Sequence, residues 1–179
     1  MQERTLVIVK PDAYQRGLTG VIIARLEQRG LVLEAMRLSR GEKEMVEDHY
    51  PRSQEWLATV GGKTLEDYAK LGVSAKDRLG TDDAVEIGQM VRRWLTEFML
   101  SAPVVPMVMS GNRAIETVRK IVGHTLPVLA APGTIRGDYS SDSPDLANSE
   151  QRPVKNLIHA SGDPEEAARE IKLWFPELG

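Results

Sequence analysis

The chain of 179 residues contains no cysteine, which excludes disulfides and thiolate metal sites. No apolar run approaches the roughly 18 residues that a membrane span needs. Lysine and arginine number 23 against 26 acidic residues, and the net charge of −3 argues against a general nucleic-acid-binding protein. Only 5% of the residues are aromatic, so the core must be mostly aliphatic. We therefore expect a globular cytoplasmic protein that could still bind a small anion through a local cluster of cations.

The length suits one domain spanning residues 1–179. The first residues lead directly into a strand-like run, so we expect no signal peptide. Two stretches depart from the regular pattern and are interpreted as insertions, at about 57–89 and 139–153. The first contains two weakly helical segments bounded by glycine. The second is rich in Ser, Asp, Asn and Pro, and we expect it to form a long surface loop.

The pattern of apolar residues predicts alternating strands and helices. Short apolar runs predict strands at 5–9, 31–38, 103–109 and 154–159. Helical spacing predicts helices at 19–29, 45–56 (interrupted by Pro51), 114–122 and after Asp163, where Pro164 and Glu166 complete a helix-start signal. The order is β-α-β, a helical region, then β-α-β. It indicates an α+β, ferredoxin-like βαββαβ sandwich with a four-stranded antiparallel sheet and helices on one face.

A glycine-rich segment resembles part of a phosphate-binding P-loop. Gly62, Lys63 and Thr64 match the end of that motif, but the complete motif needs a glycine where Leu57 stands and a buried strand before it. We therefore reject the P-loop and interpret the segment as a glycine turn in which Thr64 caps a helix.

The histidines differ in their surroundings. His49 is expected within a helix and His124 in a turn, both exposed to solvent. His159 ends the last strand, beside small residues and the N-terminus of a helix, which favours anions. Spacing alone fits a structural histidine as well as a catalytic one. Glu170 neighbours the apolar stripe of the last helix, where a His159 N–H would satisfy its carboxylate and fix the ring; the alternative is a solvated carboxylate.

Cations offer a possible phosphate site. Lys10 ends the first strand, Arg119 lies in a helix, and Arg136 lies in a turn-rich segment. Each alone could be a solvated side chain. Three charge-assisted hydrogen bonds of roughly 1.5–3 kcal/mol each would suffice to hold an abundant nucleotide. Spacing alone leaves open whether the three side chains converge.

Four segments together resemble the nucleoside diphosphate kinase family: RTLVIVKPDAYQRGLTGVII, PGTIRGD, NLIHASG and EIKLWF. The resemblance implies a ferredoxin-like fold and transfer of the γ-phosphoryl group of a nucleoside triphosphate such as ATP to a nucleoside diphosphate. It implies a ping-pong mechanism through phosphohistidine, with broad base specificity. His159 matches the nucleophile, Glu170 the acidic residue that holds it, and Ser161 the serine beside it. Positions matching phosphate or ribose contacts are Lys10, Tyr50, Arg119, Thr125, Arg136 and Asn156.

The resemblance also implies the cofactor and the partners. Mg²⁺ would be carried by the nucleotide phosphates, so no protein ligand is assigned to it, and the protein would be a homo-oligomer, either tetramer or hexamer. We expect neither nucleic acid as the main ligand nor a membrane. The base-stacking aromatic residue stays open between Trp56 and Trp94, because the first insertion interrupts that region. Two rival functions also stay open: a nucleotide-binding regulatory module without turnover, and an oligomeric scaffold.

Overall fold

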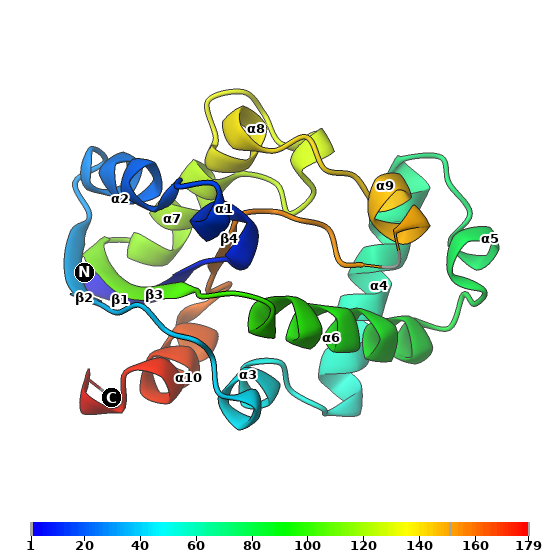
Figure 1. Ribbon diagram of the computed structural model, residues 1–179, viewed down its shortest axis with the longest axis horizontal. Coiled ribbons are helices and arrows are strands. Elements are labelled where there is room, and N and C mark those ends of the chain that lie inside the picture. Colours follow the sequence, from blue (N-terminus) through cyan, green and yellow to red (C-terminus); the bar gives the residue numbers. More distant parts are fainter. Residues whose placement is uncertain (1, 151, 179) are drawn as a thin grey trace.

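The structure is a computed structural model that describes residues 2–150 and 152–178. Its centre is a four-stranded antiparallel sheet in the order β2-β3-β1-β4 (Figure 1). The strands are β1 (Gln2–Val9), β2 (Val32–Met36), β3 (Val105–Asn112) and β4 (Ile158–Ala160). The predicted α+β, ferredoxin-like sandwich is confirmed.

Helices cover both faces of the sheet, so the prediction of helices on one face is wrong. The helices are α1 (Pro11–Gln15), α2 (Thr19–Glu27), α3 (Lys43–His49), α4 (Gln54–Lys70), α5 (Ala75–Leu79), α6 (Ala84–Leu100), α7 (Ala114–Val122), α8 (Ile135–Tyr139), α9 (Pro144–Ser149) and α10 (Pro164–Trp174). Two short 3₁₀ helices are also present, η1 (Pro127–Leu129) between α7 and α8 and η2 (Pro176–Leu178) after α10. Helices α2 and α7 lie on one face, and α3 and α10 on the other (Figure 1).

The apolar run of β1 explains this two-sided burial. Val7 and Val9 belong to the core under α2 and α7, whereas Leu6 and Ile8 belong to the core under α3 and α10. All four are fully buried, because successive side chains of a strand point to opposite faces and both faces are covered.

Several predicted elements differ from the observed ones. The helix expected at 45–56 is two helices, since α4 starts anew at Ser53, whose Oγ accepts a hydrogen bond from the Trp56 N–H. Strand β4 is shorter than expected, because Leu157 has a left-handed φ of 68° just before it. The loop expected at 139–153 contains the short helix α9.

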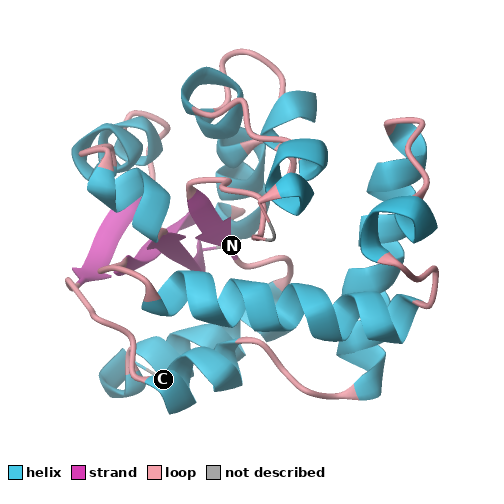
Figure 2. Cartoon of the chain, turned by 45° about the vertical axis from the view of Figure 1, so that its right-hand side comes forward, coloured by secondary structure: helices cyan, strands magenta, loops and turns pink. Residues whose placement is uncertain are grey.

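The two long helices α4 and α6 cross, as Figures 1 and 2 show, and a glycine of each helix lies against the backbone of the other. A Cβ on Gly61 would overlap the backbone of Ala84, and a Cβ on Gly88 would overlap the backbone of Leu57. The former P-loop candidate therefore lies inside a helix. The predicted turn with a Thr64 cap is wrong, since the Thr64 hydroxyl donates to the Val60 carbonyl within α4.

Among the described residues, no helix is both long enough and apolar enough to cross a membrane.

Candidate active site

His159 and Glu170 meet on the face of the sheet that α3 and α10 cover. His159 pairs with Ile8 across the β1–β4 ladder, and its imidazole Nε2 lies 2.9 Å from Glu170 Oε2. The Ser161 hydroxyl donates to the same carboxylate oxygen at 2.7 Å. Residues 159 and 161 share this face because they stand two apart in extended backbone, while Glu170 lies on the buried stripe of α10. The structure thus brings together the three side chains that the sequence singled out as a catalytic group.

The hydrogen bond to Glu170 fixes the tautomer of His159. Nε2 donates to the carboxylate and holds the proton, which leaves a lone pair on Nδ1. Burial lowers the pKa of the His159 imidazole, and the positive charges of Lys10 and Arg136 lower it further, while Glu166 acts in the opposite direction. The side chain is still 17% exposed. The ring is therefore neutral near pH 7, and part of the side chain is open to solvent.

His49 also belongs to this group, so the prediction of a solvated side chain is wrong. It ends α3 and is 2% exposed, and its ring centroid lies 4.5 Å from that of His159. Its Nδ1 lies 3.5 Å from Glu170 Oε1. The sequence did hold a signal, because Val46, His49 and Tyr50 follow helical spacing along one face that packs against the core. His124, by contrast, is partly exposed, as expected of a turn.

Lys10 and Asn156 form a second, polar group at the end of the sheet. Lys10 follows β1 directly, is buried, and donates from Nζ to Asn156 Oδ1 at 2.8 Å. Asn156 Nδ2 donates in turn to the Thr125 carbonyl at 3.0 Å. Burial lowers the pKa of the Lys10 ammonium to about 8, assisted by the charge of Arg136 and opposed by that of Asp12.

Arg136 braces the backbone that leads to His159. Its guanidinium donates to the carbonyls of Asn156 at 3.0 Å, Gly123 at 3.0 Å and Ile158 at 2.7 Å. Each terminal nitrogen keeps one N–H that these bonds do not use. Burial lowers the pKa of Arg136 to about 9, and the neighbouring charge of Arg119 contributes.

Asp12 is a site residue that the sequence analysis missed. It is buried, and its Oδ2 accepts a hydrogen bond at 3.0 Å from the backbone N–H of Leu157. This bond secures the left-handed residue just before β4. Its position two after Lys10, in the KPD segment, was the available signal.

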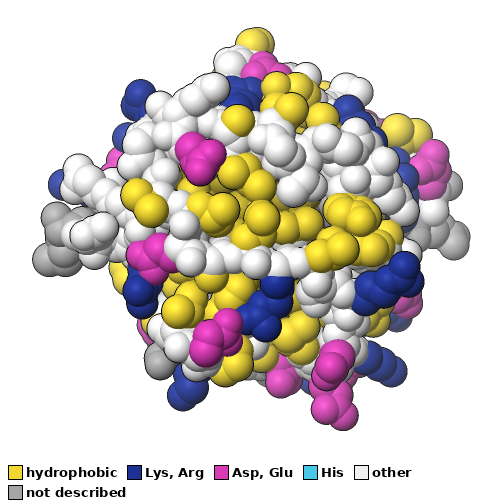
Figure 3. Space-filling model, turned by 60° about the vertical axis from the view of Figure 1, so that its left-hand side comes forward, with side chains coloured by type: hydrophobic (Ala, Val, Ile, Leu, Met, Phe, Trp, Pro, Cys, Tyr) yellow, Lys and Arg dark blue, Asp and Glu magenta, His cyan; other side chains and the backbone are white. Residues whose placement is uncertain are grey.

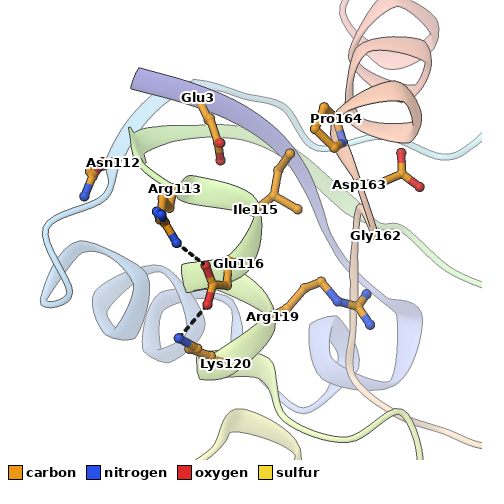
Figure 4. Close-up of a pocket in the computed structure, with 10 residues that line it drawn as sticks. All are labelled: Glu3, Asn112, Arg113, Ile115, Glu116, Arg119, Lys120, Gly162, Asp163 and Pro164. Atoms are coloured by element: carbon orange, nitrogen blue, oxygen red, sulfur yellow. Dashed lines mark hydrogen bonds and ion pairs between the residues drawn. The ribbon is translucent and has the colours of Figure 1, made fainter. Parts of the chain in front are cut away.

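The remaining predicted contact residues lie around this group. Arg119 extends from α7 toward the backbone at Gly162, beside a hollow of about 860 Å³ that Asp163 also lines (Figure 4). His159 does not line this hollow. Thr125 exposes its side chain, whereas Tyr50 is buried with no partner for its hydroxyl among the described residues. Burial raises the pKa of the Tyr50 phenol.

The lowered pKa values of two buried cations have a chemical consequence. The charge of Arg136 contributes to the lowered pKa of Lys10, the charge of Arg119 contributes to that of Arg136, and Asp12 opposes both effects. Like charges held together in a buried setting create a positive field that an anion relieves. The charges of Lys10 and Arg136 also reach His159, whose pKa they lower, so the positive field extends to its imidazole.

In the described part of the chain, His49, His159 and Glu170 are the one group of histidine and carboxylate side chains close enough to share a metal ion. The 2.9 Å separation of His159 Nε2 and Glu170 Oε2 is that of a hydrogen bond. We therefore interpret the group as hydrogen-bonded side chains.

A neutral imidazole braced by a carboxylate beside converging cations is the arrangement of a phosphotransferase. A sequence model of the nucleoside diphosphate kinase family matches residues 3–57 and 84–178. A nucleoside diphosphate kinase from Pyrobaculum aerophilum is 53% identical over 98% of this chain and 96% of its own length. One from Saccharopolyspora erythraea is 40% identical over 99% of this chain and all of its own length.

Solved structures agree with these relatives. An NDP kinase crystal structure from Pyrobaculum aerophilum superposes with a TM-score of 0.90 at 51% identity, covering 98% of this chain and 96% of that one. A nucleoside diphosphate kinase from Borrelia burgdorferi, described as a transition-state mimic with bound vanadate and ADP, has a TM-score of 0.76 at 33% identity, covering 97% and 87%. The chain belongs to the nucleoside diphosphate kinase family. It is an enzyme of phosphoryl transfer between nucleotides, and such substrates imply a divalent cation.

Proposed function

We propose that the γ-phosphoryl group of a nucleoside triphosphate, ATP included, passes to His159 and from there to a nucleoside diphosphate. The observation that carries this proposal is the hydrogen bond from His159 Nε2 to Glu170, which leaves Nδ1 free beside the buried cations. The phosphohistidine intermediate would give ping-pong kinetics, and recognition through phosphates and ribose would give broad base specificity.

In the first half-reaction, His159 Nδ1 attacks the γ-phosphorus. The Nδ1–P bond forms while the bond from phosphorus to the bridging oxygen breaks, and the nucleoside diphosphate leaves with that electron pair. The proton stays on Nε2, and the carboxylate of Glu170 offsets the positive charge that develops on the ring. Ser161 keeps the carboxylate oriented through its hydroxyl. A second nucleoside diphosphate reverses these steps.

The proposed nucleotide contacts are Lys10, Tyr50, Arg119, Thr125, Arg136 and Asn156. Lys10, with its lowered pKa, would regain its full charge when a phosphate lies beside it. Arg136 would offer the N–H groups that its backbone bonds leave unused. We propose Mg²⁺ as the divalent cation, carried into the site by the nucleotide phosphates as part of the substrate.

Incubation with γ-³²P-labelled ATP and Mg²⁺ tests the proposal. The protein should take up acid-labile label, release it to CDP as labelled CTP, and lose both properties in His159→Asn. The matched control His124→Asn, in a partly exposed turn, should label normally. Acid-stable label, or label retained by His159→Asn, would contradict the role of His159. Binding of ADP without any CTP formation would instead identify a regulatory module.

We propose as well that the protein is a homo-oligomer, a tetramer or a hexamer. Strand β2 is an edge of the sheet, and its residues Val32 and Met36 are 56% and 49% exposed. Figure 3 shows hydrophobic side chains gathered on the side of the molecule where β2 lies. An unpaired apolar edge favours pairing with another chain. Light scattering should give a mass of four or six chains, and Met36→Glu should lower it; a monomeric wild-type protein would contradict the proposal.

The single domain over residues 1–179, with insertions at about 57–89 and 139–153, and the cytoplasmic location both remain proposals from the sequence.

A further inference from the structure

Glu170 has a second neighbour of chemical interest besides His159. The carboxylate is 1% exposed, and its Oε2 already accepts hydrogen bonds from His159 and Ser161. Its other oxygen, Oε1, faces His49 Nδ1 at 3.5 Å and an Arg169 terminal nitrogen at 3.6 Å. We propose that His49 is a positioning residue for the phosphoryl transfer proposed above, on which this inference rests: it holds Glu170 and the ring of His159 in the orientation that the reaction needs.

The ring of His49 is fixed on several sides. Trp174 Nε1 lies 3.3 Å from His49 Nδ1, and the two rings stand at 81°. The rings of His49 and His159 also meet edge to face, at 81° and 4.5 Å, while Tyr50 packs 4.7 Å away. A ring confined in this way packs against the His159 imidazole and so favours the observed orientation of that ring.

The single nitrogen Nδ1 of His49 lies between a donor and an acceptor. It accepts from Trp174 when the proton is on Nε2, and it donates toward Glu170 Oε1 when it carries the proton itself. Nε2 has no hydrogen-bond partner among the described residues. In the second tautomer each oxygen of Glu170 faces an imidazole N–H, at 2.9 and 3.5 Å, which orients the carboxylate toward His159 Nε2, and the Trp174 N–H loses its acceptor.

Burial, more than any neighbouring charge, keeps His49 neutral. The titratable and charged groups around the pair are His159, Lys10 and Tyr50, together with Arg169 of α10 and the N-cap residue Asp163 before it. Burial lowers the pKa of His49 to about 3, so the ring brings no charge of its own. Glu170 therefore keeps its full negative charge for the His159 ring. Burial raises the pKa of Glu170, while His49 acts to lower it.

Two amide substitutions separate positioning from packing. His49→Asn places an N–H near the position of Nδ1, whereas His49→Gln places it near that of Nε2. His49→Phe keeps a ring and removes both nitrogens. Val46→Ala, in the same helix and the same core but absent from the contacts of Glu170, is the control for packing alone.

The test is the rate of phosphoenzyme formation in single-turnover experiments with labelled ATP, measured from pH 5 to 9. We expect His49→Phe and His49→Gln to lose about 10- to 100-fold in this rate with an unchanged ATP concentration dependence, and His49→Asn to lose clearly less. The acidic limb of the pH–rate profile should move to higher pH in the Phe and Gln variants, because the Glu170 carboxylate loses the N–H at the Nδ1 position that favours its charged form. Val46→Ala should leave the pH profile in place.

The outcomes distinguish this inference from the proposed function. A wild-type protein that takes no acid-labile label on His159 refutes the proposed function. A wild-type protein that labels, with His49→Gln and His49→Asn equally active and an unmoved pH profile, refutes the positioning role alone. Should His49→Phe fail to fold, the comparison of Asn with Gln still decides the question.

Discussion

Different contacts stabilise two regions of the molecule, the end of the sheet and the helical arm. The helical arm comprises α4, α5 and α6 (residues 54–100). At the sheet end, buried polar groups bind one another, as in the pairs of Lys10 with Asn156 and of Ser161 with Glu170. The arm is held by the close contact of its helices at glycines and by a small hydrophobic cluster around Tyr68, Ala75 and Ile87, and an exposed ion pair, Arg78 with Asp145 at 3.9 Å, connects it to α9. Substitutions at the sheet end should therefore change chemistry, and substitutions in the arm should change stability.

The largest effect is expected for Glu170→Gln. The amide fills the same space, but it lacks the charge that offsets the developing charge on His159. We predict a loss of roughly 100- to 1,000-fold in kcat with the melting temperature preserved, because a buried charge has been removed. Steady-state kinetics and thermal unfolding measure the two quantities. The control Glu165→Gln, exposed on the same helix, should keep its activity. A kcat of Glu170→Gln within twofold of wild type would contradict the expected difference between the sheet end and the arm.

Gly88→Ala should have the opposite effect, lowering stability while leaving activity nearly unchanged. The added Cβ would overlap the backbone of Leu57 in α4, so the two helices must separate. We predict a loss of about 1–3 kcal/mol in the free energy of unfolding, with kcat within a few-fold of wild type. Gly62→Ala is the matched control, since its Cβ would meet nothing within 4 Å. Equal stability of the two variants in urea would show that the helices do not touch at these glycines.

The pH dependence of stability should reveal the buried neutral His49. Its pKa falls from 6.5 to about 3 on folding, so the unfolded state binds the proton first. The free energy of unfolding is therefore lost as pH falls from about 6.5 toward 3, by up to about 1.4 kcal/mol per pH unit. Burial raises the pKa of Glu170, so this group has the opposite effect: above the ordinary pKa of a glutamate, it increases the free energy of unfolding as the pH falls. The slope of the free energy of unfolding against pH should differ between wild type and His49→Asn, and this difference gives the contribution of His49. Identical slopes would show that His49 does not contribute.

We expect the smallest effect on stability for the exposed ion pair between Arg78 and Asp145. Arg78→Met should cost less than about 0.5 kcal/mol, because both partners are solvated. Arg152→Met makes the matched comparison, since Arg152 donates to both oxygens of the buried Asp142, at 2.6 and 3.0 Å. We expect a loss of about 1.5–3 kcal/mol for that variant. Equal losses in chemical denaturation would remove the distinction between the two kinds of contact.

The sheet end was largely predictable from the sequence because its signals are local. The apolar run of β1, the helix start at Asp163 and the spacing of His159 and Ser161 each fix an element or a face without reference to distant residues. Asp163 caps α10 as expected, accepting a hydrogen bond from the Glu166 N–H.

Other features depend on contacts between elements, which sequence patterns do not encode. The burial of His49 follows from packing of α3 on α10, where Arg169 donates to the Asp48 carbonyl at 3.1 Å. Glycine at 61 and 62 suggested a turn because glycine disfavours isolated helices, yet Gly61 and Gly88 permit the close approach of α4 and α6. Helix α9 has no periodicity and is too short to be predicted by pattern.

The most direct test of the central claim is to find which nitrogen of His159 carries the phosphoryl group. Because Nε2 donates to Glu170, we predict that ³¹P–¹⁵N correlation spectra of the phosphorylated, ¹⁵N-labelled enzyme will join phosphorus to Nδ1 of His159, with Nε2 still protonated. Phosphorus bonded to Nε2, or to another residue, would contradict it.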